Sequence, residues 1–321
     1  MPSVTCNDPF LGGDGRFVTP ARVAIVIVTY NSAPVLGGCL DSLAAGAEGT
    51  RLAAVVVADN ASKDDSLALA GKAELPVRPV QVGRNAGYAA AINAGIAALD
   101  LAELDAVLVL NPDCRLRPGA LAALCAALDR PGTGIAVPRL VSTDGVLHHS
   151  LRRTPAVRRA LAEALIGGGP AARIGTLGEM VTDPERYERP GPADWATGAA
   201  MLLSVEMIER IGPWDESFLL YSEETDYALR AGDAGWTLWY DPEAVVEHIG
   251  GEAKTSPMLA ALLTVNRVRL FRRRRGRVAS AGFYLAVLLG EAMRAAAGRR
   301  TARASVVALL RPSRRLRTLP G

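Results

Sequence analysis

Short apolar runs alternate with helical patterns over the first 140 residues of the chain. Each run has the length of a strand, and a stretch with helical composition follows it. Strands that alternate with helices in this way predict a mostly parallel, doubly wound sheet of the α/β class. The predicted strands are residues 23–28, 53–58, 77–82 and 106–110, and the predicted helices are residues 34–45, 63–73, 86–99 and 118–128.

The pattern changes after residue 140. Asp144-Gly145 is typical of a hairpin turn, and residues 151–193 mix a basic helical segment, a glycine-rich break and loops bounded by proline. Regular structure is expected to resume after this stretch. The predicted elements there are an ordered segment at residues 195–203, helices at 205–211 and 224–234, and a strand at 236–240.

The composition is that of a large globular protein. The chain has 321 residues, of which 50% are hydrophobic, so it can form two moderate domains or one large one. Its four cysteines lack the spacing of a zinc site and favour reduced thiols in a cytosolic protein over a disulfide framework. Residues 1–20 lack the basic and apolar regions of a signal peptide, and we predict that they form a flexible tail.

Charge is distributed unevenly along the chain. Residues 1–252 contain 20 Lys+Arg and 32 Asp+Glu, whereas residues 253–321 contain 16 Lys+Arg and one acid, Glu291. A basic tail on an acidic body predicts an anionic partner. Apolar segments lie beside the arginines of the tail and aromatic residues are few there, which favours an anionic membrane surface over nucleic acid.

The uncharged stretches of the tail are short. The longest, residues 278–290, has 13 residues, whereas a membrane span needs about 20. We therefore predict no transmembrane helix and interpret this segment as an interfacial helix, in which Phe283, Leu285, Leu288 and Leu289 share much of one face. A helix packed on the domain, with its arginines in solvent, is the alternative.

Polar side chains follow three of the predicted strands. Thr29 and Asn31 come after the first strand, Asp59 and Asn60 after the second, and Asp113 after the fourth. In an open α/β sheet, ligands bind outside the carboxyl ends of the strands. These side chains are therefore candidates for a ligand or metal site, although turn or helix capping would also explain Asp59 and Asp113.

A loop with two glycines follows the third predicted strand. Its sequence is Gly83-Arg84-Asn85-Ala86-Gly87-Tyr88. Glycine lets the backbone approach a phosphate or a ribose closely. The chain has no GxGxxG and no P-loop sequence, which argues against the dinucleotide-binding and ATP-binding classes.

A second acidic cluster lies at Glu223, Glu224 and Asp226. Three carboxylates within four residues repel one another, and such crowding raises the pKa of at least one, as a general base requires. The solvated start of a helix would also favour acids here. His248 follows a predicted strand and precedes two glycines, so it is a candidate ligand or a core histidine. No HExxH spacing supports zinc-dependent hydrolysis.

Taken in order, these segments resemble a known family. Val26-Ile27-Val28-Thr29-Tyr30-Asn31, Asp59-Asn60-Ala61-Ser62, Gly83 to Tyr88 and Leu110-Asn111-Pro112-Asp113 are similar to the nucleotide-sugar half of family 2 inverting glycosyltransferases. Trp195-Ala196-Thr197-Gly198-Ala199, Gly212-Pro213-Trp214-Asp215-Glu216-Ser217-Phe218 and the acidic cluster are similar to the acceptor half. The resemblance covers about residues 22–255 and is strongest to rhamnosyltransferase-like enzymes, which include enzymes acting on polyprenyl-diphosphate sugars of actinobacterial cell walls.

The resemblance implies a fold and a division of the chain. The fold is of GT-A type, with a mostly parallel doubly wound sheet and a C-terminal helical extension. Residues 21–140 would form the nucleotide-sugar half and residues 141–255 the acceptor-binding and catalytic half. The charge pattern beyond the resemblance predicts that residues 256–321 form a basic helical extension, with the membrane surface as its expected partner.

The implied activity is metal-dependent, inverting transfer from a nucleoside-diphosphate sugar, either dTDP-rhamnose or a UDP-sugar. The acceptor would be a hydroxyl of a lipid-linked or cell-wall saccharide, and the enzyme would lie on the cytoplasmic face of the plasma membrane. A catalytically degenerate protein of the same fold, which binds the nucleotide sugar or a partner, is the alternative. A sugar-phosphate nucleotidyltransferase is disfavoured, because the glycine-rich start of that class is missing after the first strand.

The resemblance also implies roles for single residues. Asp59 would contact the nucleobase, and the other donor-binding residues would be Thr29, Asn31, Asn60, Arg84, Asn85, Gly87 and Asn111. Asp113 and His248 would hold a divalent cation, Mg²⁺ or Mn²⁺. Glu224 would be the catalytic base, and Trp214, Asp215 and Glu223 would bind the acceptor.

Two positions depart from the family pattern. Asn111 replaces the first aspartate of the family's Asp-x-Asp motif, a variant that is common in the rhamnosyltransferase-like subgroup. Glu224 stands where the family usually has an aspartate, so its carboxylate is displaced by about one methylene group, and small displacements at a reacting centre can be costly.

Overall fold

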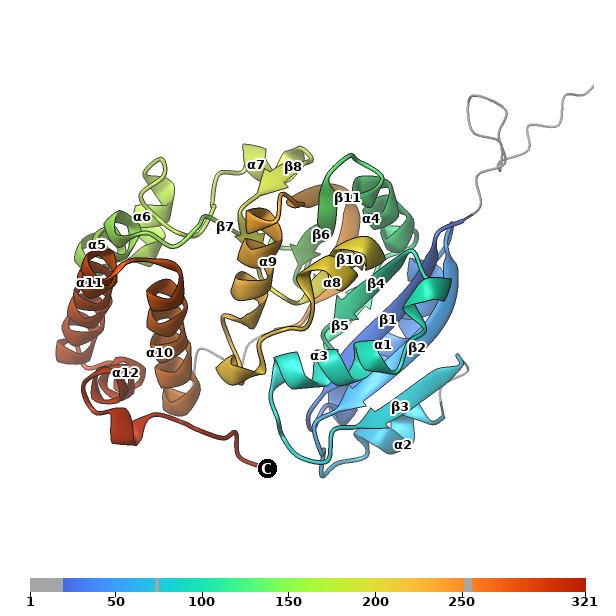
Figure 1. Ribbon diagram of the computed structural model, residues 1–321, viewed down its shortest axis with the longest axis horizontal. Helices are drawn as coiled ribbons and strands as arrows, with labels where there is room; N and C mark the ends of the chain where they lie inside the picture. Colours follow the sequence, from blue (N-terminus) through green and yellow to red (C-terminus); the bar gives the residue numbers. More distant parts are fainter. Residues whose placement is uncertain (1–19, 73–74, 251–255) are drawn as a thin grey trace, which may run out of the picture.

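The computed structural model describes residues 20–72, 75–250 and 256–321 (Figure 1). The flexible tail predicted for residues 1–20 lies outside the described residues, apart from Pro20, and so does Cys6. The last residue of the helix predicted at 63–73 lies outside them as well.

One nine-stranded sheet forms the centre of the described chain. Its strand order is β3-β2-β1-β4-β10-β6-β11-β5, and β8 pairs with β11. The strands are β1 (Arg22–Thr29), β2 (Arg51–Asp59), β3 (Val77–Gln81), β4 (Ala106–Leu110), β5 (Cys114–Leu116), β6 (Thr133–Val141), β8 (Gly191–Ala193), β10 (Ala200–Ser204) and β11 (Thr237–His248).

The direction of the strands brings several carboxyl ends to one edge. Strands β3, β2, β1 and β4 are parallel neighbours. Strand β10 is antiparallel to both β4 and β6, and β6 is parallel to β11, so β6 and β11 run in the same direction as β1. The ends of β1, β2, β4 and β11 therefore meet at the same edge, where an open α/β sheet binds its ligands.

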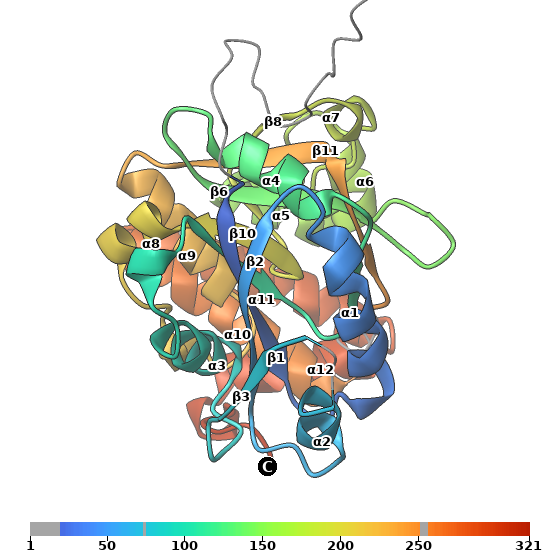
Figure 2. The ribbon, with the colours of Figure 1, turned by 90° about the vertical axis from the view of Figure 1, so that its right-hand side faces the viewer.

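The apolar runs of the sequence become strands that are buried on both faces. In β1, Val26 packs into one core cluster and its neighbour Ile25 into the other. Helices α3 (Tyr88–Ala97), α8 (Val205–Ile211) and α9 (Glu223–Asp233) cover the first face, and α1 (Ala33–Gly46), α2 (Ser66–Ala70) and α4 (Ala120–Leu128) cover the other (Figure 2). This arrangement confirms the predicted doubly wound α/β class.

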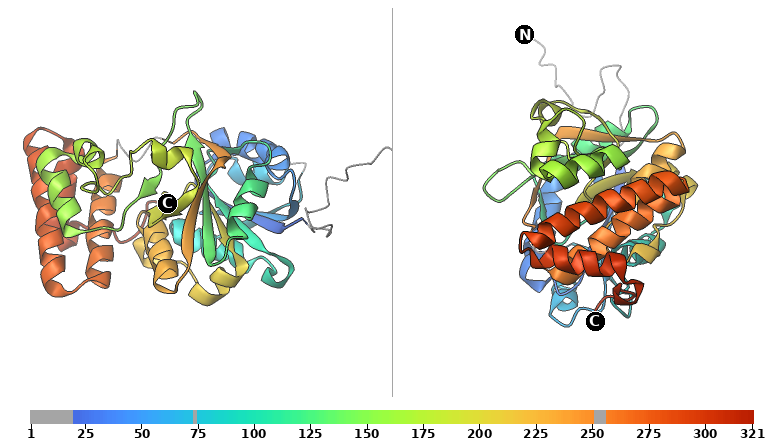
Figure 3. Two further views of the ribbon diagram at one scale, coloured as in Figure 1. Left: turned by 90° about the horizontal axis from the view of Figure 1, so that it is seen from above. Right: turned by 90° about the vertical axis from the view of Figure 1, so that its left-hand side faces the viewer.

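A layer of helices lies beside the sheet and contains the C-terminal extension (Figure 3). It consists of α5 (Val157–Ile166), α6 (Gly168–Arg173), α10 (Pro257–Arg274), α11 (Arg277–Ala296) and α12 (Arg300–Leu310). Phe271 of α10 stacks on Phe283 of α11 with ring centroids 4.0 Å apart, and both are buried in a core of their own. The prediction that Phe283 shares an outer face with Leu285 is therefore wrong, because Phe283 points into this core while Leu285 is 60% exposed.

The length argument against a membrane-spanning helix is also wrong. Helix α11 has 20 residues, because it continues through Glu291 and Arg294 beyond the uncharged stretch. Within the described residues it is the one helix that is long and apolar enough to cross a bilayer by length and composition. A core helix of a soluble protein passes the same test, and α11 packs against α5, α10 and α12.

One difference from the predicted elements has a clear cause. Strand β11 continues to His248, because the turn-like residues Asp241-Pro242-Glu243 are absorbed where its register with β6 shifts between Asp241 and Val245. Strand β6 was not predicted, although it is almost fully buried.

The turn at Asp144-Gly145 is confirmed by an antiparallel bridge between Val141 and Leu147. Among the described residues, a small sheet is formed by β7 (Leu151–Arg152) and β9 (Trp195–Ala196), and α7 is a short helix at Glu185–Glu188.

Candidate active site

A cleft of about 980 Å³ lies at the carboxyl edge of the sheet, next to the helical layer. Residues from both halves of the sequence line it. The lining residues that the sequence had proposed are Asn31, Asn111, Asp113, Glu223, Glu224 and His248. The cleft is also lined by Tyr88, Arg152 and Trp195. The structure therefore brings the carboxylates of Asp113, Glu223 and Glu224 and the imidazole of His248 into one space.

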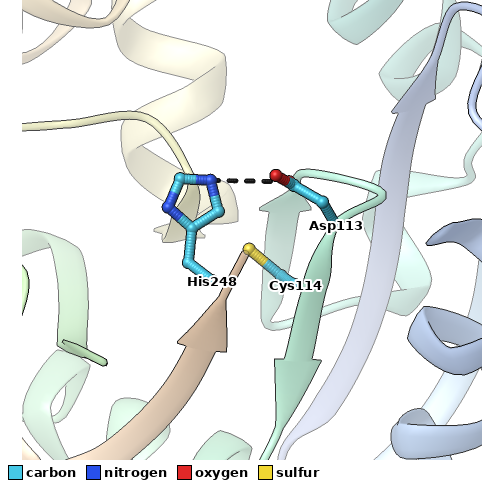
Figure 4. A group of neighbouring side chains, drawn as sticks. All are labelled: Asp113, Cys114 and His248. Atoms are coloured by element: carbon cyan, nitrogen blue, oxygen red, sulfur yellow. Dashed lines mark ion pairs between the residues drawn. The ribbon is translucent and has the colours of Figure 1, made fainter. Parts of the chain in front are cut away.

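Asp113 and His248 form the first group in the cleft (Figure 4). Strand β5 pairs with β11 so that His248 lies opposite Cys114, and this register sets the histidine beside Asp113. The Nε2 atom of His248 is 3.4 Å from Oδ1 of Asp113, and the backbone N–H of Gly250 donates to Oδ2 at 2.9 Å. The expected proximity of the two side chains is confirmed.

The electrostatics of this pair favour an ionised carboxylate. Partial burial would raise the pKa of Asp113, but the hydrogen bond and charge of His248 and the N–H of Gly250 outweigh it, so the pKa lies below its usual value. An ionised carboxylate suits Mg²⁺ or Mn²⁺, which take further oxygen ligands from substrate phosphates, and the imidazole offers one nitrogen ligand beside it.

Cys114 lies close to this pair, since one ligand atom from each of Asp113, Cys114 and His248 falls within 4.8 Å of the others. Burial raises the pKa of the Cys114 thiol well above its usual value, and the thiol donates to the carbonyl oxygen of Ala199 at 3.4 Å. A metal binds cysteine as the thiolate. The donor set therefore fits a hard cation held by Asp113 and His248 and does not fit a zinc–thiolate site.

Asn111 directly follows β4, two residues before Asp113, and its side chain accepts a hydrogen bond from Tyr88. The hydroxyl of Tyr88 is 2.8 Å from Oδ1 of Asn111 and 2.9 Å from the carbonyl oxygen of Gly198. The backbone N–H of Asn111 donates to Ala199. The neutral amide accepts the hydrogen bond from Tyr88 without adding negative charge. An aspartate at this position would place a second negative charge next to Asp113.

An unusual loop carries the second acidic cluster into the cleft. Leu219, Tyr221 and Ser222 all have positive φ angles, of 64°, 69° and 78°, a backbone region that side chains with a Cβ rarely adopt. Helix α9 begins directly after this loop, with Glu223 and Glu224 in its first turn. The loop therefore determines the direction in which the two glutamates enter the cleft.

The structure holds this strained loop from two sides. The side-chain amide of Asn266 on α10 lies 2.6 Å from the carbonyl oxygen of Phe218 and 3.0 Å from that of Leu220. On the other side, the backbone N–H of Tyr88 donates to Leu219 at 2.8 Å. Gly87 has a φ of 99°, and a Cβ there would overlap the carbonyl group of Leu219, so only glycine fits.

The two glutamates differ in their exposure. Glu223 is 2% exposed, and its Oε2 atom has no hydrogen-bond partner among the described residues. Burial, together with the charge of Glu224, raises the pKa of Glu223 well above its usual value. Glu224 is half-buried, and burial also raises its pKa, against the effect of backbone N–H groups and of the charge of Arg152. The arrangement favours a proton on Glu223 and a negative charge on Glu224.

Asp59 does not line the cleft. It is completely buried, and its carboxylate accepts hydrogen bonds from the Thr29 hydroxyl at 2.7 Å, the Ser62 backbone N–H at 2.9 Å and the Ser62 hydroxyl. Thr29 is completely buried as well. In this structure the two residues tie the ends of β1 and β2 together and do not line the cleft, and their contact with a nucleotide stays a prediction.

The other residues proposed for the donor shape two neighbouring loops. Asn31 lies in the left-handed region at φ 50° and accepts from the backbone N–H of Lys63 at 2.8 Å. Asn60 donates to the carbonyl oxygen of Gly87 at 3.2 Å and so fixes the glycine loop. Arg84 is exposed, and Asn85 donates to the carbonyl oxygen of Pro320 at 2.8 Å. The C-terminal segment thus touches the donor-side loops.

Trp214 and Asp215 lie outside the cleft. Trp214 is 2% exposed and stacks on Tyr227 with ring centroids 4.3 Å apart. Asp215 accepts from the backbone N–H of Ser217 at 2.9 Å and forms an ion pair with Arg273 of α10. Both residues support the base of the loop that leads to α9 and neither lines the cleft, so their contact with an acceptor stays a prediction.

Sequence reasoning missed several residues of the cleft. Arg152 comes from the two-residue strand β7 and stands over Trp195 of β9, with its guanidinium carbon 5.9 Å from the ring centroid. Tyr88 was part of a recognised motif, but its contact with Asn111 depends on the position of α3. Arg267 of α10 is paired with Glu163 and Glu179 at 2.7 Å each. No local pattern signals such contacts between distant segments.

Residues 24–182 match the family model described as glycosyl transferase family 2. The N-acetylglucosaminyl-diphospho-decaprenol L-rhamnosyltransferase of Mycobacterium tuberculosis is 33% identical to this chain over 233 residues, which cover 70% of this chain and 75% of the relative. The chain therefore belongs to glycosyltransferase family 2 and is a glycosyltransferase. A more distant relative, the low-salt glycan biosynthesis hexosyltransferase Agl10 of Haloferax volcanii, is 27% identical over 65% of this chain and 61% of its own length.

Solved structures show the same fold. A crystal structure of GalNAc-T7 with UDP, GalNAc and Mn²⁺ has a TM-score of 0.59 at 17% identity, and the match covers 78% of this chain and 48% of that chain. The mannosyltransferase PcManGT from Pyrobaculum calidifontis, in complex with GDP-Man and Mn²⁺, has a TM-score of 0.55 at 18% identity and covers 92% of this chain and 82% of that chain. The predicted GT-A fold is thereby confirmed.

Proposed function

We propose that this glycosyltransferase moves a sugar from a nucleoside-diphosphate sugar to a saccharide hydroxyl, with inversion and with a divalent cation. The observation that carries the proposal is the single cleft that both Asp113 with His248 and Glu223 with Glu224 line. A cation-binding pair next to an acid pair suits a reaction in which a diphosphate leaves while a hydroxyl loses its proton.

Asp113 and His248 would hold Mg²⁺ or Mn²⁺. A bound cation would neutralise the negative charge that develops on the leaving diphosphate. The known structures named above contain Mn²⁺ together with a nucleotide or a nucleotide sugar, which supports the same arrangement here. Asn31 and Asn111 line the same cleft and would bind the donor beside this pair.

Glu224 would act as the general base. Its carboxylate takes the proton of the acceptor hydroxyl while the hydroxyl oxygen bonds to the anomeric carbon of the donor. The bond from that carbon to the diphosphate oxygen breaks at the same time, and its electron pair leaves with the diphosphate. Attack opposite the leaving group inverts the anomeric configuration. A proton on Glu223 keeps the charge of the pair on Glu224.

The relatives support a choice of substrates. The Mycobacterium tuberculosis relative is named as a rhamnosyltransferase of N-acetylglucosaminyl-diphospho-decaprenol. We therefore propose dTDP-rhamnose as the donor, with a UDP-sugar as the second candidate. For the acceptor we propose a polyprenyl-diphosphate or cell-wall saccharide.

The proposed function is tested by measuring sugar transfer with Mn²⁺, with Mg²⁺ and with a chelator, for the native protein and for Asp113→Ala. Transfer that needs the cation, and a cation-dependent gain in donor affinity that Asp113→Ala loses by about 10–100-fold, are expected. Cys39→Ala, which removes a buried thiol outside the cleft, is the control for general damage. A gain in donor affinity with Mn²⁺ that persists in Asp113→Ala would contradict the metal assignment.

We also propose that the helical layer rests on an anionic membrane surface on its cytoplasmic side. Leu161 and Leu165 of α5 and Leu285 and Leu289 of the neighbouring α11 are each at least 42% exposed. Exposed apolar side chains on adjacent helices are suited to the interface between headgroups and acyl chains, and the arginines of the extension would attract anionic lipids.

Membrane contact is tested by flotation with vesicles of defined composition. Leu285→Asp with Leu289→Asp is expected to weaken binding to anionic vesicles at least tenfold, since each leucine loses part of about 1.5–3 kcal/mol of burial. Val146→Asp is the matched control, because Val146 is 64% exposed in the turn after β6. Removal of residues after 265 is not a clean test, because Asn266 holds the loop before α9. Equal binding of all variants would contradict the proposed surface.

A further inference from the structure

A second cavity lies outside the active-site cleft and is not explained by the reaction. It has a volume of about 1200 Å³ and lies among α10, α12 and residues 312–317. Typical small-molecule sites have volumes of roughly 300–1,000 Å³, so this cavity is large enough for an extended ligand. We refer to the cavity enclosed by these three segments as the arginine groove.

The lining of the arginine groove combines two kinds of side chain. Its walls contain aliphatic residues of both helices, of which Met258 is 39% exposed and Val307 is 42% exposed. Its lining also contains seven arginines and, among the described residues, no acidic side chain. The arginines are Arg269, Arg272, Arg273, Arg303, Arg314, Arg315 and Arg317.

Most of this positive charge is not neutralised by the protein. Within the described part of the chain, Arg273 is the one arginine of the groove that forms an ion pair, with Asp215. Arg272 and Arg314 are exposed, and no carboxylate of the described residues lies within ion-pair distance of them. Guanidinium groups bind phosphate oxygens through paired hydrogen bonds. An apolar channel with unpaired guanidinium groups at its side therefore fits an amphiphile with a phosphate head.

The groove adjoins the active-site cleft. Ser217 and Leu219 line the groove, whereas Leu220 and the residues up to Thr225 line the cleft. The two spaces are thus separated by the loop that leads to α9. Arg269 donates to the carbonyl oxygen of Ser217 at 2.6 Å, so positive charge lies at the boundary between the groove and the cleft.

We propose that the arginine groove binds the polyprenyl diphosphate of the acceptor, with the prenyl chain between α10 and α12 and the diphosphate against the arginines. This inference rests on the proposed function, because it assumes an acceptor whose saccharide enters the cleft. In such an acceptor the diphosphate joins the saccharide to the lipid, and the boundary at Ser217 provides cationic groups at that junction. A membrane phospholipid would need a phosphate site but no neighbouring saccharide cleft.

The test is a binding measurement that needs no sugar transfer. A polyprenyl diphosphate without a saccharide is titrated in detergent micelles into the full-length protein, and phosphatidylglycerol is titrated in the same micelles. The groove variant is Arg272→Gln with Arg314→Gln. The control is Arg299→Gln with Arg300→Gln, which removes the same charge from two exposed arginines of the same extension that do not line the groove.

The groove variant is expected to bind the polyprenyl diphosphate about 25-fold more weakly, at about fivefold for each arginine near an anionic lipid headgroup. The control should stay within about twofold of the native protein, and the thermal shift produced by the donor should be unchanged in both. Equal losses in the two variants would show general charge attraction and overturn the proposal. Phosphatidylglycerol that binds as tightly and responds to the same variants would assign the groove to membrane phospholipid and overturn it as well.

Failure of the proposed function gives a different result. A native protein that binds the polyprenyl diphosphate in the groove but transfers no sugar to its saccharide derivative would contradict the proposed reaction and leave the lipid site in place. Transfer to that derivative with an unchanged KM in the groove variant would contradict the groove alone.

Discussion

The proposed donor side and the proposed acceptor side of the protein each contain a buried carboxylate, and the two carboxylates differ in their hydrogen bonds. Asp59, at the end of β2, is completely buried and receives hydrogen bonds from Thr29 and Ser62. Glu223, at the start of α9, is 2% exposed, and the described residues leave its Oε2 atom without a partner. The oxygens of the first carboxylate therefore all accept hydrogen bonds, whereas the second carboxylate keeps one buried oxygen without a partner among the described residues.

This difference indicates what each side is built to do. Hydrogen bonds to Asp59 join two strand ends into a rigid edge, which can support loops that bind a nucleotide. In the acid pair on α9, the buried Oε2 atom of Glu223 has no hydrogen-bond partner among the described residues, and the pKa values of both glutamates are raised. Groups with perturbed pKa values concentrate at functional sites, because chemistry needs a proton that can move. The strain in the preceding loop, at Leu219 and Tyr221, lies on the same side.

The largest effect is expected from Glu224, the half-buried member of the acid pair. Glu224→Gln keeps the shape of the side chain and removes its ability to accept a proton. It should lower kcat by about 10²–10⁴-fold, the usual range for loss of a general base, with the donor affinity retained. Measurement of kcat and of donor binding in parallel checks this. Unchanged turnover would move the role to another carboxylate or remove the base from the mechanism.

Much of the donor side could be predicted from the sequence because its signals are local. The apolar run at 23–28 is strand β1, and the polar residues after β1, β2 and β4 do meet at one edge. His248 was placed at a strand end even though β11 is longer than predicted. In each case, an apolar run followed by polar residues marks the end of a strand and so predicts where the polar side chains lie.

The acceptor side could be predicted only in part, because its geometry depends on contacts between distant segments. The sequence indicated three crowded acids, but it did not indicate that Glu223 would be buried or that Trp214 would stack on Tyr227 outside the cleft. The loop before α9 adopts three left-handed residues without a single glycine, and Asn266 holds it from 40 or more residues further along the chain. Arg152 enters the cleft through a pairing of two short strands, for which no local pattern exists.

The second-largest effect is a difference in stability between variants of the two buried carboxylates, Asp59 and Glu223. Asp59→Asn replaces one of the two acceptor oxygens with an NH2 group, which cannot accept, so at least one of the hydrogen bonds from Thr29 and Ser62 is lost. Leaving buried donors without partners costs about 1–3 kcal/mol, so the free energy of unfolding should fall by that amount at neutral pH. Chemical denaturation of Asp59→Asn and of Glu223→Gln, which makes the same exchange of carboxylate for amide, is the comparison. Equal destabilisation of the two variants would contradict the difference between the two sides.

The smallest effect is a change in the pH dependence of stability at Glu223. Its pKa is raised in the folded protein from an ordinary value of 4.5, so above pH 4.5 the folded state keeps a proton that the unfolded state has lost. Stability then falls as pH rises from 4.5 toward the raised pKa, the opposite of a carboxylate held in its charged form. Glu223→Gln carries no titrating proton and should show a shallower fall over this range. Denaturant midpoints measured from pH 4.5 to pH 8 for the native protein and the variant check this. If the midpoints of the native protein and of Glu223→Gln changed with pH in parallel, Glu223 would be ionised in the folded protein. Both glutamates of the pair would then carry a negative charge, which would contradict the proposed protonation of Glu223.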